Sequence, residues 1–448
     1  MNTEDVCLKI ARRERFSAMD VKIEKLVYGG EGLAHYEGST VFVPYVLPGE
    51  TARATPFETK KKFVRARLDH LIAPASERVA ARCPYFSVCG GCDYQHIPYE
   101  AQLKYKADIL RETLRRLGRV EWSGEIATHA SPPYGYRNRA QWKIRARDKS
   151  PAGDSSAGRK IFDIGYFRAN STSLCAVDQC PIVSPLLERS LKALHVALAA
   201  GELPRELREI EVFADPSDTK LLLTATFAGF PSHADEYAAK IRGLIPETES
   251  LVFHDPGRER MELDGPGFIT CEAGGESFRV GHFSFFQVNR FLIGDMVRTV
   301  AGEESGNAAC DLYAGVGLFS LPLARRFNRV IAVESNPAAT RDLEQNASQG
   351  AGIIVRTSDV ERAIERMKEK FDLIVLDPPR AGLAPGSAAR LAKLGAQRIT
   401  YVSCEPPTLA RDLAVILQAG YGIRSIDLFD LFPQTFHMET IVKLERGA

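Results

Sequence analysis

The stretch Ala309-Cys-Asp-Leu-Tyr-Ala-Gly-Val-Gly317 predicts a strand that runs into a turn with two glycines. A second predicted strand, Arg329-Val-Ile-Ala-Val-Glu334, ends about twenty residues later on a carboxylate that can accept hydrogen bonds from both hydroxyls of a ribose. From about Gly281 onward, strand, turn and helix alternate, which predicts a doubly wound α/β sheet. No P-loop lysine or positive patch accompanies the turn. The sequence therefore predicts a nucleoside cofactor without phosphates, such as S-adenosylmethionine.

Two more predicted strands end on chemically active side chains. Leu373-Ile-Val-Leu-Asp377-Pro-Pro-Arg380 contains the end of one, and Ile399-Thr-Tyr-Val-Ser-Cys404 contains the end of the other. Open α/β sheets build their sites at such strand ends, so we expect the cofactor and a thiol to share one pocket. Arg380, and not an aromatic residue that could stack on a base, follows the two prolines. This disfavours attack on a ring nitrogen or an exocyclic amine and favours a carbon acceptor.

Cys404 has the chemistry that methylation at C5 of a pyrimidine requires. C5 is too weak a nucleophile to take a methyl group from a sulfonium directly, but a thiolate that adds to C6 turns the ring into an enolate with charge on C5. A base must then remove the C5 proton, and Phe432-Pro-Gln-Thr-Phe-His437-Met-Glu439 offers two candidates. We choose Glu439, at the entry to the last predicted strand, and keep His437 in reserve. An ordinary buried cysteine is the alternative for Cys404.

Three cysteines lie close together in Cys83-Pro-Tyr-Phe-Ser-Val-Cys89-Gly-Gly-Cys92. Gly90 and Gly91 give this loop the freedom to wrap the thiols around one centre. Cys180, which a proline follows, is the better candidate for a fourth ligand, and Cys175 is the reserve. Four thiolates suit an iron–sulfur cluster or structural zinc, and the spacing favours the cluster. Three unrelated core cysteines are the alternative.

The composition of the 448-residue chain indicates a globular protein of about three domains. Its formal net charge is +1, so any basic binding surface must be local. The charged first residues lack the apolar core of a signal peptide, and no stretch approaches membrane-spanning length. Nine cysteines in so long a chain form no secreted disulfide framework. We therefore expect a cytoplasmic protein without a membrane segment.

Changes of pattern divide the chain into three predicted domains. Residues 14–72 alternate apolar and polar side chains between short turns, which predicts a small barrel whose last strand, Thr59–Arg67, is strongly basic. Residues 73–280 hold the cysteine cluster, a predicted helix over 99–117 and the mixed helices and strands of an α+β domain. Residues 281–448 form the doubly wound domain, and the helix at about 99–120 is a candidate to pack on it.

A cationic stripe follows the predicted helix. A strand period of two puts its polar side chains on one face, namely Arg137, Arg139, Gln141, Lys143, Arg145 and Arg147. Five cations side by side repel one another unless an anion lies across them, and nucleic-acid phosphate is the usual candidate. A partly paired, solvent-facing strand is the alternative.

Together these residues resemble the RNA uracil-C5 methyltransferase family. The resemblance covers nearly the whole chain and includes Phe283-Ser-Phe-Phe-Gln287-Val-Asn289, which is similar to the family's signature before the cofactor domain. It implies a Rossmann-like class I methyltransferase domain, an N-terminal OB-like TRAM barrel that binds RNA, and a central α+β domain. It also implies S-adenosylmethionine contacts from Gln287, Tyr313, Glu334 and Asp377, Cys404 as nucleophile, Glu439 as proton acceptor, and a [4Fe-4S] cluster on Cys83, Cys89, Cys92 and Cys180.

Two positions depart from the family pattern. Glu405 follows Cys404 where the family usually has asparagine, and a neighbouring carboxylate disfavours the thiolate unless it points away or is neutralised. Leu318 follows the glycine turn where many members have asparagine, which removes one polar contact to the cofactor.

The resemblance implies a monomeric enzyme whose partner is RNA. The cluster and the barrel favour 23S ribosomal RNA over the T-loop uridine of transfer RNA, because the common bacterial transfer-RNA enzymes resemble a shorter chain without them. Cytosine-C5 methylation is an alternative, which would be expected to show a proline-cysteine motif. A cluster-carrying RNA-binding protein with an inactive transferase domain is the other, and the intact Cys404, Glu439 and Glu334 speak against it.

Overall fold

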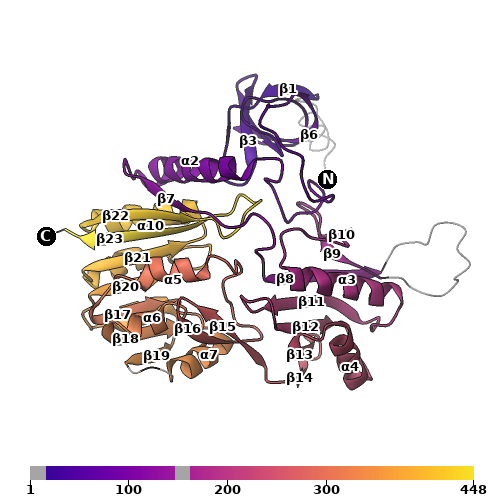
Figure 1. Ribbon diagram of the computed structural model, residues 1–448. Coiled ribbons are helices and arrows are strands. Elements are labelled where there is room, and N and C mark those ends of the chain that lie inside the picture. Colours follow the sequence, from indigo (N-terminus) through magenta and orange to yellow (C-terminus); the bar gives the residue numbers. More distant parts are fainter. Residues whose placement is uncertain (1–16, 147–161, 349, 351, 448) are drawn as a thin grey trace, which may run out of the picture.

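The computed structural model describes residues 17–146, 162–348, 350 and 352–447. Figure 1 shows a small barrel, built from the first strands, that stands apart from two larger groups of strands and helices. One group contains the central part of the chain, and the other contains the C-terminal part together with α2 and β7.

The N-terminal barrel is a six-stranded sheet with the order β1-β5-β6-β4-β3-β2. Its inward side chains, among them Val41, Ala52 and Val64, form a core of their own. The predicted basic strand starts later than expected, because the Lys60 N–H donates to the Phe63 carbonyl in a turn. The strands are β1 (Met19–Lys22), β2 (Lys25–Leu26), β3 (Glu31–Tyr36), β4 (Ser39–Pro44), β5 (Thr51–Thr59) and β6 (Phe63–Ala73).

The central sheet has seven strands in the order β10-β9-β8-β11-β12-β13-β14, of which only the neighbours β12 and β13 are parallel within the described residues. Leu187 and Leu194 of helix α3 share a buried cluster with Trp142 of β8, so helices cover this sheet as in an α+β domain. The elements are β8 (Arg139–Ala146), β9 (Phe162–Phe167), β10 (Leu174–Ala176), α3 (Pro185–Ala199), β11 (Leu207–Ala214), β12 (Leu221–Phe227), α4 (Ala234–Leu244), β13 (Thr248–Asp255) and β14 (Arg260–Asp264).

A hairpin of β15 (Phe268–Ala273) and β16 (Glu276–Gly281) joins the central sheet to the C-terminal one. Phe278 of β16 belongs to a buried cluster that contains Leu222 of the central sheet and Val330 of the C-terminal sheet. The two sheets are therefore held together by a shared apolar core.

The C-terminal sheet has eight strands in the order β19-β18-β17-β20-β21-β23-β22-β7. The strands from β19 to β21 are parallel, whereas β23 is antiparallel to both of its neighbours. The chain order reverses at β17, which pairs with both β18 and β20. The predicted doubly wound sheet is thereby confirmed. Its strands are β7 (Ile126–His129), β17 (Gly306–Leu312), β18 (Phe327–Glu334), β19 (Ile353–Thr357), β20 (Leu373–Leu376), β21 (Arg398–Ser403), β22 (Tyr421–Phe429) and β23 (Glu439–Arg446).

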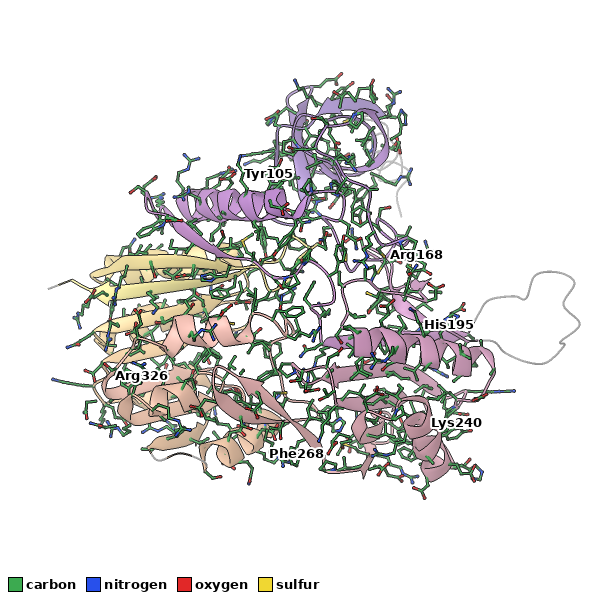
Figure 2. All side chains as sticks on the ribbon, viewed as in Figure 1. Tyr105, Arg168, His195, Lys240, Phe268 and Arg326 are labelled. Carbon is green, nitrogen blue, oxygen red and sulfur yellow. The ribbon has the colours of Figure 1, made fainter. Side chains whose placement is uncertain are left out.

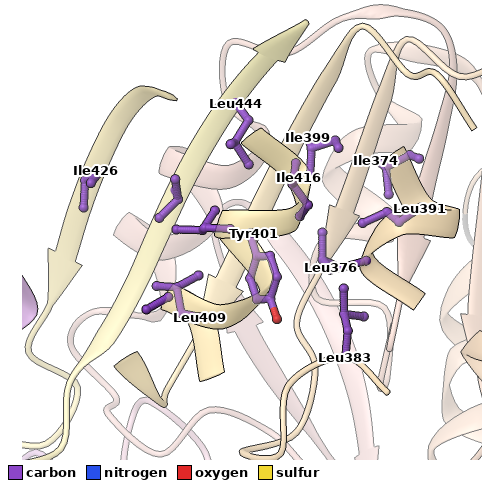
Figure 3. Packing of buried hydrophobic residues seen from close by; sticks show 14 of the residues in the cluster. Ile374, Leu376, Leu383, Leu391, Ile399, Tyr401, Leu409, Ile416, Ile426 and Leu444 are labelled. Carbon is purple, nitrogen blue, oxygen red and sulfur yellow. The ribbon is translucent and has the colours of Figure 1, made fainter. Parts of the chain in front are cut away.

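Helices cover this sheet and bury its apolar strands, as Figure 3 shows around Tyr401. Helix α2 also packs here, because Leu110 and Leu114 share a buried cluster with Leu409. A Cβ atom on Gly118 would lie 2.6 Å from the Ala410 carbonyl oxygen, so the close approach of α2 to α10 requires glycine. The helices are α2 (Tyr99–Gly118), α5 (Ile293–Ala301), α6 (Ser320–Ala324), α7 (Pro337–Ala347), α8 (Val360–Arg366), α9 (Ser387–Lys393) and α10 (Pro406–Gln418).

No helix among the described residues is both long enough and apolar enough to span a bilayer.

Candidate active site

The predicted site residues gather at the edge where the parallel strands of the C-terminal sheet end. Tyr313 follows β17, Glu334 ends β18, Asp377 follows β20 and Cys404 follows β21. Because β23 runs in the opposite direction, its first residue, Glu439, lies at the same edge. The strand order therefore unites side chains that are far apart in the sequence.

Cys404 is surrounded by acids that disfavour its thiolate. Burial raises the pKa of Cys404 to about 12, and the carboxyl groups of Glu439, Asp377 and Glu405 add to this effect in that order, whereas Arg380 opposes it. Without a bound partner, the sulfur is therefore a neutral thiol at physiological pH.

The two acids beside Cys404 also hold their protons more tightly than usual. Burial, and then the nearby Asp377, raise the pKa of Glu439 well above its ordinary value. One Glu439 oxygen, Oε1, is buried without a hydrogen-bond partner among the described residues. Burial raises the pKa of Asp377 to about 7. Such paired, shifted carboxyl groups are typical of a site that moves protons.

His437, the reserve base, is kept neutral. Burial and the positive charge of Arg380 lower its pKa to about 4. Its ring lies against the ring of Phe436, with 4.1 Å between the centroids, and its Nδ1 has no hydrogen-bond partner in the described part of the chain. The structure thus brings both candidate bases to one edge.

Glu405 is the N-cap residue immediately before α10, but its side chain makes no capping hydrogen bond to the described helix. Its carboxylate lies near the hydroxyl of Tyr28, a barrel residue, and raises the pKa of that hydroxyl together with burial. The Tyr28 hydroxyl has no hydrogen bond of ordinary geometry within the described residues. The carboxylate that departs from the family pattern therefore faces the barrel, and it has a smaller effect on Cys404 than Glu439 has.

The glycine turn after β17 is tied to the end of β18. Glu334 Oε2 accepts a hydrogen bond from the Gly315 N–H at 2.8 Å, and Glu334 Oε1 accepts from the N–H groups of Ser335 and Asn336. Gly317 has a φ of 95°, a left-handed conformation that favours glycine. Tyr313 donates from its hydroxyl to Glu361 at 3.1 Å. Tyr313 and Glu334 thus lie together at the turn predicted for the cofactor.

Gln287 and Leu318 are both buried, and no side-chain hydrogen bond of Gln287 is found within the described residues. Gln287 is buried in the segment between β16 and α5. The neighbouring Asn289 donates to the carbonyl oxygens of Asp430 and Leu431, so this segment contacts the loop that leads to Glu439. Leu318 packs in the apolar core beneath the turn.

Four cysteines line one cavity of about 250 Å³. They are the predicted set, Cys83, Cys89, Cys92 and Cys180. Cys175 does not line it, although it is near enough to raise the pKa of Cys83 and Cys89. Among the described residues, no group of three or more His, Cys, Asp or Glu side chains is arranged so that it could hold a metal ion.

Gly90 has a different role in the cysteine loop from the expected flexibility. A Cβ atom at this position would lie 3.2 Å from Cα of Ala169, and the Gly90 N–H donates to the Phe167 carbonyl at 3.0 Å. The glycine therefore allows the loop to lie directly against the end of β9.

Two of the five cations in the stripe pair with acids of β11, as in the partly paired strand that was the alternative. Arg139 lies 3.6 Å from Glu211, and Lys143 pairs with Glu209. Arg145 is exposed and donates to the carbonyl oxygens of Ile144 and Arg208, whereas Arg147 lies outside the described residues. Sequence reasoning missed this pairing because the partner acids come from a distant strand.

A cleft of about 850 Å³ lies between the barrel, the cysteine loop and the central sheet. Figure 2 labels Arg168, one of its lining residues, below the barrel on the side of the central sheet. The cleft leads to the active site, because Tyr28 and Phe436 line it with their ring centroids 5.4 Å apart. Its other lining side chains include aromatic residues, cations and two acids: Tyr45, Phe57, Tyr166, Phe167, Arg65, Arg67, Lys143, Glu31 and Asp93. Arg65, Arg67 and Lys143 each lie within 4 Å of a carboxylate, so Arg168 is the lining cation without an ion pair among the described residues.

The sequence of this chain is similar to those of known proteins and protein families. Residues 276–447 match the family described as tRNA (uracil-5-)-methyltransferase, and residues 12–68 match the TRAM domain. A Klebsiella pneumoniae subsp. pneumoniae protein named 23S rRNA (uracil(1939)-C(5))-methyltransferase is 33% identical over 433 residues, which cover 93% of this chain and 93% of that protein. The chain belongs to the RNA uracil-C5 methyltransferase family.

A second relative and one solved structure are also similar to this chain. An Aquifex aeolicus protein named as an uncharacterized RNA methyltransferase is 31% identical over 442 residues, which cover 95% of this chain and 98% of that protein. The structure of a Pyrococcus abyssi tRNA (uracil-54, C5)-methyltransferase in complex with S-adenosyl-L-homocysteine has a TM-score of 0.73 at 24% identity, covering 95% of this chain and 100% of that one. The predicted class I methyltransferase fold with a TRAM barrel is confirmed, and so is the enzyme class.

Two contributors to the site were missed from the sequence. Arg380 was considered only as a residue that cannot stack on a base, yet its charge favours the Cys404 thiolate. Tyr28 was not among the predicted site residues. Its position beside Glu405 results from the docking of the barrel, for which the local sequence carries no signal.

Proposed function

We propose that this enzyme uses S-adenosylmethionine to methylate C5 of a uridine in RNA, with 23S ribosomal RNA as its substrate and a covalent Cys404 adduct as its intermediate. The observation that carries the proposal is the placement of Cys404 and Glu439 at facing ends of β21 and β23, with Asp377 beside them. A thiol for C6 and a carboxyl group for the C5 proton then approach one pyrimidine ring from the same edge of the sheet.

The bound cofactor supplies an electrophilic methyl group on a cationic sulfonium. Tyr313, Glu334, Gln287 and Asp377 are the residues that would hold the cofactor. The shared turn geometry of Tyr313 and Glu334 supports this assignment.

The residues of this chain then have separate tasks. Cys404 gives its proton to solvent, with Arg380 favouring the thiolate. The sulfur then forms a bond to C6 of the uracil ring, and the electrons of the C5–C6 double bond move into an enolate that spans C5, C4 and the C4 oxygen. After C5 has been methylated, Glu439 as a carboxylate takes the C5 proton. The electrons of the C5–H bond form the C5–C6 double bond, and the C6–S bond breaks to restore the Cys404 thiolate.

RNA as the substrate class is supported by the cleft that ends at Tyr28 and Phe436. Cations contact phosphate without sequence preference, and aromatic rings offer stacking surfaces for unpaired bases. Transfer RNA is the second candidate, because residues 276–447 match a family described by a transfer-RNA activity.

Deletion of the gene, followed by mapping of 5-methyluridine, tests the substrate. We expect one or more 5-methyluridines to disappear from 23S ribosomal RNA and to return when the wild-type gene, but not a Cys404→Ala gene, is supplied. Loss from transfer RNA alone would transfer the assignment to the second candidate. Unchanged 5-methyluridine in both RNAs would contradict the proposed activity.

We also propose that Cys83, Cys89, Cys92 and Cys180 hold a [4Fe-4S] cluster. The cavity that all four cysteines line supports this, because their thiols surround one space in which a cluster could be held. The cluster is remote from Cys404 in sequence, and we assign it a structural role.

A further inference from the structure

The loop of residues 430–438, between β22 and β23, leads directly into Glu439. Its middle residue, Gln434, is buried and has a φ of 69°, a conformation that side chains other than glycine rarely adopt. The Gln434 carbonyl oxygen accepts hydrogen bonds from the N–H groups of Asp93 and Tyr94, both at 2.9 Å. The position of this loop is therefore set by a segment far away in the sequence.

Side chains reinforce these backbone contacts. Gln102 Nε2 donates to Gln434 Oε1 at 3.0 Å, and Gln434 N donates to Gln102 Oε1 at 3.0 Å, so the two residues form a reciprocal pair. Asp93 Oδ2 accepts from the Phe436 N–H at 3.4 Å. Gln102 is completely buried, which makes loss of this pairing costly.

The same segment continues into the cysteine loop. Asp93 follows Cys92 directly, and Gln95 Oε1 accepts from the Cys83 N–H at 2.9 Å. In the described structure the residues from Cys83 to Asp93 form neither a helix nor a named strand. A group bound by the cysteines would thus order this loop and, through Asp93, residues 430–438.

We propose that Asp93 and Gln102 are positioning residues, which hold the 430–438 loop and hence Glu439, and that occupancy of the cysteine site is transmitted to the loop through Asp93. The inference rests on the proposed roles of Glu439 and of the four cysteines. In this proposal, a cluster bound by the cysteines supports catalysis by positioning Glu439, without contacting the substrate.

Hydrogen–deuterium exchange of the full-length protein tests the contacts independently of RNA methylation. In Asp93→Ala and Gln102→Ala, the amides of residues 430–438 should exchange faster by a factor of about 5 to 30, as expected for the loss of one or two hydrogen bonds. Amides of the glycine turn after β17 should not change. In Asp93→Asn, the amides of residues 430–438 should exchange as slowly as in the wild type, because the asparagine side-chain oxygen can still accept a hydrogen bond from the Phe436 N–H. Asp235→Ala, on the exposed start of α4, is the matched control.

Two further measurements distinguish positioning from a general loss of structure. Gln102→Ala, at a residue that does not line the cleft, should lower kcat for methylation while the KM for RNA and the affinity for S-adenosyl-L-homocysteine stay near wild type. Wild-type protein stripped of iron by a chelator should show the same faster exchange at residues 430–438. Unchanged exchange in Asp93→Ala and Gln102→Ala would overturn the positioning role, and unchanged exchange after iron removal would overturn the transmission. The hydrogen–deuterium exchange measurements on the variants and on the iron-free protein remain informative if the enzyme proves inactive on every RNA tested.

Discussion

Ser403 lies opposite Thr440 in the antiparallel ladder between β21 and β23. This pairing places Cys404, the next residue after Ser403, and Glu439, the residue before Thr440, at the same end of the two strands. Burial of Glu439 beside Asp377 raises its pKa, and Glu439 is the strongest of the charges that raise the pKa of Cys404. Ionisation of Glu439 therefore makes the Cys404 thiolate harder to form.

Replacement of Cys404 and replacement of Glu439 should stop the methylation reaction at different steps. Cys404→Ala should form no covalent adduct with RNA and should lose at least about a thousandfold in activity. Glu439→Gln should add to the base and methylate it, but stall before elimination, so that a methylated protein–RNA species accumulates. A denaturing gel with labelled cofactor shows this species. If His437→Ala traps the adduct and Glu439→Gln turns over normally, His437 is the base.

The alkylation rate of Cys404 should report the surrounding charges. With a pKa of about 12, the thiolate is a small fraction at pH 8, and the rate with iodoacetamide should rise about tenfold per pH unit up to that pKa. Asp377 has a pKa of about 7 and is mainly ionised above it, so Asp377→Asn should speed alkylation at pH 8 to 9 but not below pH 6. Arg380→Gln should slow the alkylation of Cys404, because the charge of Arg380 favours the thiolate. Faster alkylation of that variant would contradict this effect of Arg380.

The fourth cluster ligand can be identified by composition. Cys180→Ala should lose iron and acid-labile sulfide, whereas Cys175→Ala should keep both, because Cys180 lines the cavity and Cys175 does not. Cys175 is buried, so its replacement should still lower the free energy of unfolding by about 1 kcal/mol. Stoichiometric zinc without sulfide in anaerobically purified protein would rule out the cluster.

The buried ion pair of Lys106 and Asp430 should be important for stability. Both side chains are completely buried, with Lys106 Nζ 2.6 Å from Asp430 Oδ1 and 3.1 Å from the Phe432 carbonyl. Lys106→Met leaves a buried charge without its partner, and we expect the free energy of unfolding to fall by about 3 to 5 kcal/mol. Denaturant unfolding measures it. Arg189→Met, which breaks the exposed pair with Glu247, should cost less than about 1 kcal/mol.

We expect RNA affinity to depend more on the cations of the cleft than on those of the cationic stripe. Arg67→Glu and Arg168→Glu should weaken RNA binding and lower its salt dependence by about 0.7 to 0.9 in the log–log slope for each phosphate that the protein no longer neutralises. The effect of Arg145→Glu should be smaller, because Arg145 does not line the cleft. Lys192→Glu on α3 is the control. Equal binding by all four variants would remove the cleft from the RNA site.

The sequence determined the parts of this protein that depend on local pattern. The strand before the glycine turn, the acid at Glu334 and the strand ends at Asp377 and Cys404 could be predicted, because buried strands and tight turns have short-range signatures. The TRAM, class I methyltransferase and enzyme assignments followed from combining such motifs. The limits of the three domains, the monomeric state and the cytoplasmic location stay predictions.

Only the tertiary structure decided which of these pieces meet. The antiparallel insertion of β23 brings Glu439 to Cys404, and the packing of the barrel brings Tyr28 to Glu405. The pairing of β8 with β11 neutralises Lys143, a charge that looked free in the sequence. Likewise β7 joins the edge of the C-terminal sheet. Each contact joins residues whose separation in the chain leaves no periodic signal, so it is fixed by strand pairing and shared burial in the folded protein.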